Sequence, residues 1–217
     1  MTDRSMPLRE LLGAPADPEF ELSLPTGWER HDASPESQAL IVQRLRRRLM
    51  RAGGVDAMRA FSALRDMLGQ SMDDMRREGV VGIFAQSAAD ASTPFPVPAS
   101  IVAKIRSAPS AEAMDGYVKQ LIVDEGAAPL GGNRALLRVE RERVHGEGDA
   151  RAVLSSTLYV TPVPGTGRRR ALELYAGYAR PTDIPRDDEQ IQFVHAVFDL
   201  MAGSLRWKTG ARDGERS

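Results

Sequence analysis

Residues 134–145 (RALLRVERERVH), 153–163 (VLSSTLYVTPV) and 170–180 (RALELYAGYAR) are three neighbouring stretches in which apolar and polar residues alternate. In the third stretch Leu172, Leu174 and Ala176 recur at every second position, which is typical of a strand with one buried face. Short loops that contain glycine connect the stretches, at 145–149 and 162–167. Such loops favour hairpins. The sequence therefore predicts three antiparallel strands in a row.

Further strands and helices are expected before and after these three. Short apolar or alternating runs predict strands at 20–24, 80–85 and 99–107, and the Gly/Pro-rich residues 126–132 predict a loop. Apolar residues at steps of three and four predict helices over 34–52, over 56–77, from Ser110 onward, and from Ile191 to Leu205. Runs of strands with helices inserted between them indicate an α+β fold. We expect one antiparallel sheet of about six strands, covered by helices, with every apolar face turned into one shared interior.

Composition sets the domain organisation and excludes several classes of protein. The chain has 217 residues, of which 42% are hydrophobic and 27% charged. These values predict one globular domain over 19–208, a flexible arm over 1–18 and a disordered tail over 209–217. The chain has no cysteine, which excludes disulfides and thiolate chemistry. A net charge of −1 gives no overall field toward nucleic acid.

No apolar run in the sequence has the length of a signal peptide core or a membrane helix. We therefore expect no membrane insertion. The expected location is the cytoplasm, with leaderless export as the alternative.

Two short phrases, one near each end of the expected domain, carry a resemblance to a known family. Residues 20–28 read FELSLPTGW, and residues 204–207 read SLRW. With the order of elements, they resemble the opening and closing phrases of the PsbP-like proteins. The nearest relatives by this resemblance are soluble, non-lipidated counterparts of the actinobacterial LpqN/LpqT-type proteins. The resemblance implies an antiparallel sheet between helical layers, in an α/β/α sandwich, and a role in binding or assembly.

Catalytic and metal-binding patterns are weak throughout the chain. His31, His145 and His195 have no ligand spacing, so no metal site is predicted. The serine motif Gly-x-Ser-x-Gly is absent, and turn chemistry accounts for the glycine pairs at 53–54 and 131–132. The sequence predicts no cofactor and no catalytic residue.

Two groups of residues are candidates for binding. Arg44, Arg47, Arg48 and Arg51 lie on the expected helix over 34–52, opposite its apolar face. They form either a solvated helix face or a docking surface for an acidic protein. The helix has no aromatic residue, which argues against nucleic acid. The second group is Tyr159, Tyr175, Tyr178 and His195, which line a pocket between sheet and helices if the strand register permits.

These observations lead to two functional hypotheses. The first is a noncatalytic protein-interaction or assembly-factor domain, associated with an actinobacterial secretion or cell-envelope system. The alternative is a small-ligand-binding protein, or a hydrolase of unrecognised type, that uses the tyrosine–histidine pocket.

Overall fold

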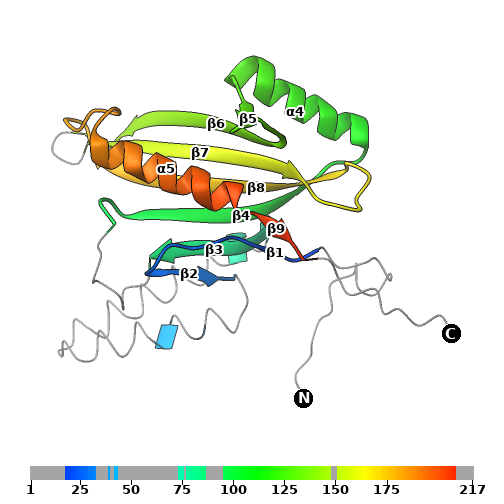
Figure 1. The fold of residues 1–217 in the computed structure, drawn as a ribbon, viewed down its shortest axis with the longest axis horizontal. Coiled ribbons are helices and arrows are strands. Elements are labelled where there is room, and N and C mark those ends of the chain that lie inside the picture. Colours follow the sequence, from blue (N-terminus) through cyan, green and yellow to red (C-terminus); the bar gives the residue numbers. More distant parts are fainter. Residues whose placement is uncertain are drawn as a thin grey trace.

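A seven-stranded antiparallel sheet is the main structural feature of the computed structural model (Figure 1). The structure describes residues 18–32, 39, 42–43, 73–75, 77–86, 95–147 and 151–208. The strand order in the sheet is β2-β3-β4-β8-β7-β6-β5. The strands are β2 (Trp28–His31), β3 (Val80–Gln86), β4 (Ala99–Ser107), β5 (Ala128–Leu130), β6 (Asn133–His145), β7 (Ala152–Pro162) and β8 (Arg170–Pro181). The prediction of an α+β fold with an antiparallel sheet is confirmed.

The three stretches that decide the fold form the centre of this sheet. β6 pairs with β7 and β7 with β8, with Leu158 opposite Val139 on one side and opposite Tyr175 on the other. β8 also pairs with the whole length of β4, from Ala99 opposite Tyr178 to Ser107 opposite Arg170. The alternation that the sequence predicts therefore sends successive residues to opposite faces of one continuous sheet.

Two helices pack on opposite faces of the sheet. Helix α4 (Ala111–Glu125) begins at Ser110, whose side chain accepts a hydrogen bond from the backbone of Ala113, and ends at Gly126 with a φ of 73°. Helix α5 (Glu189–Gly203) begins at Asp188, whose carboxylate accepts from the backbone of Gln190. These side-chain caps satisfy backbone N–H groups that lack partners within the helix. In Figure 1, α5 lies across one face of the sheet and α4 stands near the edge that β5 and β6 form.

The apolar residues form two cores, one on each face of the sheet. The larger core joins α5 to the sheet through buried residues such as Leu174 and Phe198. The smaller core joins α4 to the other face through Met114, Leu121 and Leu158. The expectation of one shared interior is therefore wrong. Apolar and polar residues alternate along the central strands, but both faces of these strands are buried. The reason is that one helix covers each face of the sheet.

Four short strands differ from the sequence prediction. The expected strand at 20–24 is shortened to β1 (Phe20–Glu21), which pairs with β9 (Arg206–Trp207) outside the main sheet. The two phrases that carry the family resemblance thus meet, with the rings of Phe20 and Trp207 5.9 Å apart. The first strand of the main sheet is β2, in the segment after the turn, and β5 lies in the segment predicted as a loop.

No helix among the described residues is long and apolar enough to cross a membrane. Arg44, Arg47, Arg48 and Arg51, together with most of the two expected helices over 34–77, lie outside the described residues.

Candidate functional site

The edge of the sheet at β6 is incompletely covered. β5 pairs only with residues 133–138 of β6, whereas β6 continues to His145. In the described ranges no strand pairs with the outer side of residues 139–145, which we call the open edge. Along such an edge every second residue turns its backbone N–H and C=O groups outward. Figure 1 shows β6 extending well past β5.

A groove of about 550 Å³ lies beside the first residues of β5, where the pairing between β5 and β6 stops and the open edge begins. We call it the edge groove. Its walls come from the end of α4, from β5, from β6 and from the α5 side of the sheet, and they include Glu125, Gly126, Pro129, Val139, Glu140 and Arg186. The groove therefore spans both faces of the sheet at one point of its edge.

Local backbone chemistry explains why β5 is short. Gly126 ends α4 in the left-handed region, and the backbone N–H of Ala127 donates to the carbonyl of Leu121 at 2.9 Å. The chain consequently joins the sheet only at Ala128, opposite Arg138. Pro129 lacks an N–H donor and is tolerated here because β5 is an edge strand. The space beside residues 139–145 remains open as a result.

The open edge carries alternating charges. Glu140 and Glu142 project to the α5 face, where they contact Arg186 and Arg180. Arg141 projects to the α4 face, where its Nε donates to Glu125 at 2.6 Å. Arg143 lies two residues further along, on the same face as Arg141, and is exposed. Val144 is 53% exposed.

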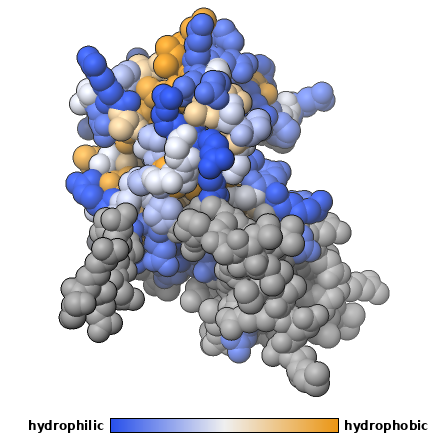
Figure 2. Space-filling view, turned by 90° about the vertical axis from the view of Figure 1, so that its right-hand side faces the viewer, coloured by the Kyte–Doolittle hydropathy of each residue, from blue (hydrophilic) through white to orange (hydrophobic). Residues whose placement is uncertain are grey.

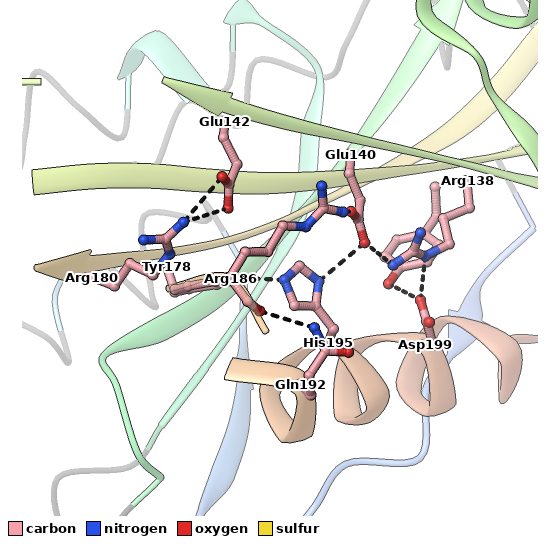
Figure 3. A network of polar contacts seen from close by, with 10 residues as sticks. Arg138, Glu140, Glu142, Tyr178, Arg180, Arg186, Gln192, His195 and Asp199 are labelled. Atoms are coloured by element: carbon pink, nitrogen blue, oxygen red, sulfur yellow. Dashed lines mark hydrogen bonds and ion pairs between the residues drawn. The ribbon is translucent and has the colours of Figure 1, made fainter. Parts of the chain in front are cut away.

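A network of polar side chains connects this edge to α5 (Figure 3). Arg138 donates through Nε to Asp199 Oδ1 at 2.7 Å, and the hydroxyl of Tyr159 donates to the same oxygen at 2.5 Å. Burial and the bond to Asp199 raise the pKa of Tyr159, so this phenol remains a donor. Arg138 and Arg186 also both contact the Glu140 carboxylate. The network therefore fixes the position of α5 relative to β6.

His195 lies inside the same network and is 6% exposed. Its Nε2 is 2.9 Å from the hydroxyl of Tyr178, and its Nδ1 is 3.3 Å from Glu140 Oε1. Burial, together with the positive charges of Arg138 and Arg186, lowers the pKa of His195. The neutral ring shares a hydrogen bond with the hydroxyl of Tyr178 through Nε2, while Nδ1 is buried beside Glu140 without a hydrogen-bond partner among the described residues. This arrangement is that of a histidine whose hydrogen bond holds a helix to a sheet.

Arg180 completes the network at the far end of β8. Its Nη2 lies 3.2 and 3.1 Å from the two carboxylate oxygens of Glu142, and its side chain is 6% exposed. Three arginines thus face three carboxylates across this region, in the pairs Arg180–Glu142, Arg186–Glu140 and Arg138–Asp199. We refer to these six residues with Tyr159, Tyr178 and His195 as the α5 network. Its formal charges balance.

The four residues of the predicted pocket do not come together. Tyr159 and Tyr178 are buried between the sheet and α5, and His195 is a buried residue of α5 itself. Tyr175 lies on the opposite face, where its hydroxyl donates to Glu173 at 3.0 Å. Tyr175 and Tyr178 are an odd number of residues apart on one strand, so they must point to opposite faces. The strand register therefore rules out a single pocket with all four residues in its wall.

A second polar cluster lies on the α4 face, and sequence reasoning missed it. Glu173 is fully buried and accepts hydrogen bonds from Tyr117 at 2.6 Å, from Tyr175 at 3.0 Å and from Arg106. The Arg106 guanidinium lies over the Tyr117 ring, 4.1 Å from its centroid. Burial and the Glu173 carboxylate raise the pKa of both tyrosines. We call these four residues the sealed cluster.

The sequence held partial signals of both clusters. Glu173 interrupts the apolar pattern of β8, and residues 138–143 alternate strictly between arginine and glutamate apart from Val139. Neither signal names the partner residues, which come from α4, α5 and β4. Within the described part of the chain, no group of three or more His, Asp or Glu residues is placed to hold a metal ion.

Comparison with known proteins yields a similarity of fold. No protein-family model and no curated protein sequence matches the chain. Among solved structures, the chain is similar to LpqN of Mycobacterium tuberculosis, which is described as involved in cell envelope biogenesis. The alignment covers 91% of this chain and 87% of LpqN, with 15% sequence identity and a TM-score of 0.41. This similarity is a distant one and concerns the fold alone.

Proposed function

We propose that the protein is a noncatalytic protein-interaction domain that binds an extended segment of a partner along the open edge. The observation that carries the proposal is the length of β6, which continues past β5 beside a groove of about 550 Å³. An added strand gains affinity from main-chain hydrogen bonds and specificity from its alternate side chains. The edge groove would bind the part of the partner segment that lies next to the start of β5.

The charge pattern of the edge disfavours a second copy of this chain as the occupant. Two identical antiparallel strands in one sheet are related by a two-fold axis perpendicular to the sheet. Residues opposite one another then lie on the same face, so Arg141 meets Arg143 or itself and Glu142 meets a glutamate or Val144. Like charges directly opposite one another destabilise a sheet. Alternating charges of this kind are a common protection of sheet edges against self-pairing.

The same pattern defines the chemistry of the preferred partner. Arg143 is exposed on the α4 side, and Val144 is exposed on the α5 side. A segment that pairs with both has an acidic residue opposite Arg143 and an apolar residue opposite Val144. We therefore infer a partner strand in which acidic and apolar residues alternate. An acidic partner agrees with the sequence hypothesis for the arginine-rich helix.

The state of the polar side chains supports binding over catalysis. In the α5 network each arginine faces a carboxylate, and His195 is neutral, buried and bonded to Tyr178. A general base needs access to the proton that it removes. The side chains of the α5 network form hydrogen bonds and ion pairs mainly with one another, so their role is to keep the open edge in position.

Hydrogen exchange with a probe peptide tests the proposal. The probe is an extended peptide of alternating glutamate and valine, and its control carries lysine in place of glutamate. We expect the glutamate peptide to slow amide exchange over residues 139–145, and Arg143→Glu to weaken its binding roughly tenfold. Arg206→Glu, an exposed reversal on β9, is the matched control and should leave binding unchanged. Equal binding of both peptides, or slowed exchange elsewhere only, would contradict the proposal.

The arginine-rich helix remains a separate prediction from the sequence. If Arg44, Arg47 and Arg48 form a docking surface, their combined reversal to glutamate should abolish capture of the partner that Arg143→Glu weakens. Retention of that partner by the triple variant would restrict the interaction to the open edge. The association with a secretion or cell-envelope system also remains a prediction.

A further inference from the structure

Helix α5 carries a second apolar stripe on the side that faces away from the sheet. Phe193, Ala196, Val197 and Leu200 follow one another there at the spacing of one helix face, and we call them the outer stripe. Phe193 is 53% exposed and Leu200 is 73% exposed, although the other side of α5 is buried in the larger core. Figure 2 shows patches of apolar surface among hydrophilic residues in the upper part of the molecule, where Figure 1 places α4 and α5. A helix with apolar residues on both sides is typical of one that is buried on both.

No ionised side chain interrupts the outer stripe. Between residues 190 and 203 the one ionised side chain of α5 is that of Asp199, which is bonded to Arg138 in the α5 network. Helix α4 differs, because Lys119 lies one turn before its most exposed apolar residue, Val123. A single exposed apolar residue is common on protein surfaces, whereas a continuous apolar row marks an interaction surface.

The two ends of α5 carry charges of opposite sign. Asp187 and Glu189 are exposed at the start of the helix, and neither forms an ion pair with another described residue. Arg206 is exposed just beyond the end of the helix, where its side chain donates to the carbonyl of the preceding residue at 2.8 Å. Glu21, which lies opposite Arg206 in the β1–β9 pair, is bonded to Lys208 instead. Within the described residues, an unpaired acidic side chain therefore precedes the outer stripe and an arginine without an ion pair follows it.

We propose that the outer stripe is the interface of a homodimer in which the α5 helices of two copies pack antiparallel about a two-fold axis. A contact of this symmetry uses the same patch on both copies, so the patch must be complementary to itself. The outer stripe meets this requirement, because an axis beside Ala196 and Val197 sets Phe193 of each copy opposite Leu200 of the other. The methyl side chain of Ala196 allows the two helix axes to approach to about 8 Å.

The antiparallel arrangement also accounts for the charges. It places the start of each α5 beside the end of the other, so that Asp187 of each copy faces Arg206 of the partner subunit. Opposite charges across the interface favour this orientation over a parallel one, in which like ends meet. Phe95, whose ring is 5.9 Å from that of Phe193, and Leu130, which lies beside the last residue of α5, widen the apolar contact. The interface uses a different surface from the open edge and does not depend on the proposed function.

Analytical ultracentrifugation of the full chain tests the proposal. An interface built on one helix from each copy is small, so we expect a reversible dimer with a micromolar Kd. Leu200→Lys should raise this Kd at least about tenfold. Val123→Lys, at a similarly exposed position in the last turn of α4, should leave it unchanged. A single monomeric species up to about 100 µM, or equal effects of the two substitutions, would overturn the proposal. A monomer that Leu200→Lys destabilises would show that another part of the same chain covers the stripe, and this result would overturn it too.

Cysteine cross-linking tests the antiparallel register separately. The chain has no cysteine of its own, so each variant contains one thiol. Ala196→Cys lies beside the proposed axis and should form a disulfide between two copies under mild oxidation. Gln190→Cys, also exposed on α5, should not, because the two copies of this position are separated by about 20 Å along the helices. Cross-linking of Gln190→Cys would indicate a parallel pair, and the absence of a cross-link in Ala196→Cys would exclude the interface. Either result contradicts the proposal.

Discussion

The two faces of the sheet both carry charged residues within their cores, but they hold them differently. On the α4 face, Glu173 is completely buried and three donors from β4, α4 and β8 surround it. On the α5 face, the α5 network reaches the sheet edge, and the side chains of Arg138 and Asp199 retain exposed fractions of 25% and 31%. A carboxylate that cannot reach water depends entirely on its partners. The comparison indicates that the sealed cluster chiefly sets stability, while the α5 network positions the edge.

The largest expected effect comes from breaking the sealed cluster. Glu173→Gln removes the buried charge and leaves Arg106 without its partner. Because the Arg106 side chain is 37% exposed, water compensates part of this loss, and the expected cost is about 2–3 kcal/mol of unfolding free energy. Urea denaturation measures this loss. The control Glu147→Gln, at an exposed position, should stay within about 0.5 kcal/mol of the wild type. A loss of less than about 1 kcal/mol for Glu173→Gln would show that the two clusters do not differ as proposed.

Removing one hydroxyl from each face sharpens the comparison. Tyr178→Phe leaves Nε2 of the buried His195 without its hydrogen-bond partner, which costs about 1–3 kcal/mol of unfolding free energy. Tyr175→Phe leaves Glu173 with two remaining donors, so its cost should be smaller. Thermal and urea unfolding of the two variants give the order. The reverse order would mean that the hydrogen bond of His195 does not hold α5 to the sheet.

Acid should weaken the α5 face through His195. The pKa of His195 in the folded state lies below 6.5. As the pH falls through 6.5, the unfolded chain therefore binds a proton at His195 that the folded chain does not bind. This contribution to stability is fully present above pH 6.5 and is lost between that value and the lowered pKa. Urea unfolding at pH 7.5, 6.5 and 5.5 should show the decline in the wild type. The variant His195→Gln should show a smaller decline, and parallel declines would rule out the assignment.

The smallest effect is expected at the open edge itself. The ion pair between Arg141 and Glu125 is partly exposed, with side-chain exposed fractions of 41% and 33%. Such pairs contribute about 0–1 kcal/mol and weaken with added salt. A double-mutant cycle of Arg141→Gln and Glu125→Gln should therefore give a coupling energy below about 1 kcal/mol. A larger coupling would assign the edge charges to stability instead of recognition.

Local pattern predicted much of the fold, and its failures have a common cause. The periods of β6, β7 and β8 placed the central strands correctly, and Ser110 predicted the start of α4. β5 was missed because Pro129 and the glycines around it are typical of loops, and only pairing with β6 makes it a strand. β1 was assigned to the main sheet because no local signal indicates that Phe20 pairs with Trp207, 187 residues later.

The candidate site was predicted in part only, for a related reason. The hypothesis of a pocket named Tyr159, Tyr178 and His195, which do come together, but it also included Tyr175, which the period of two sends to the other face. The open edge was not foreseen. An unpaired strand edge is defined by where neighbouring strands stop, and the sequence of β6 does not contain that information.

The amino-acid sequence alone determined the kinds of element, their order and the α+β class, because these depend on the spacing of apolar residues and on turn and cap chemistry. Only the tertiary structure determined that two cores form and that Glu173 is buried among three hydrogen-bond donors. It also determined that β6 extends beyond β5, which leaves an unpaired edge and a groove. The physical reason is that burial and pairing depend on residues distant in the chain. Each strand has two sides and two faces, and only the assembled neighbours determine which of them meet water.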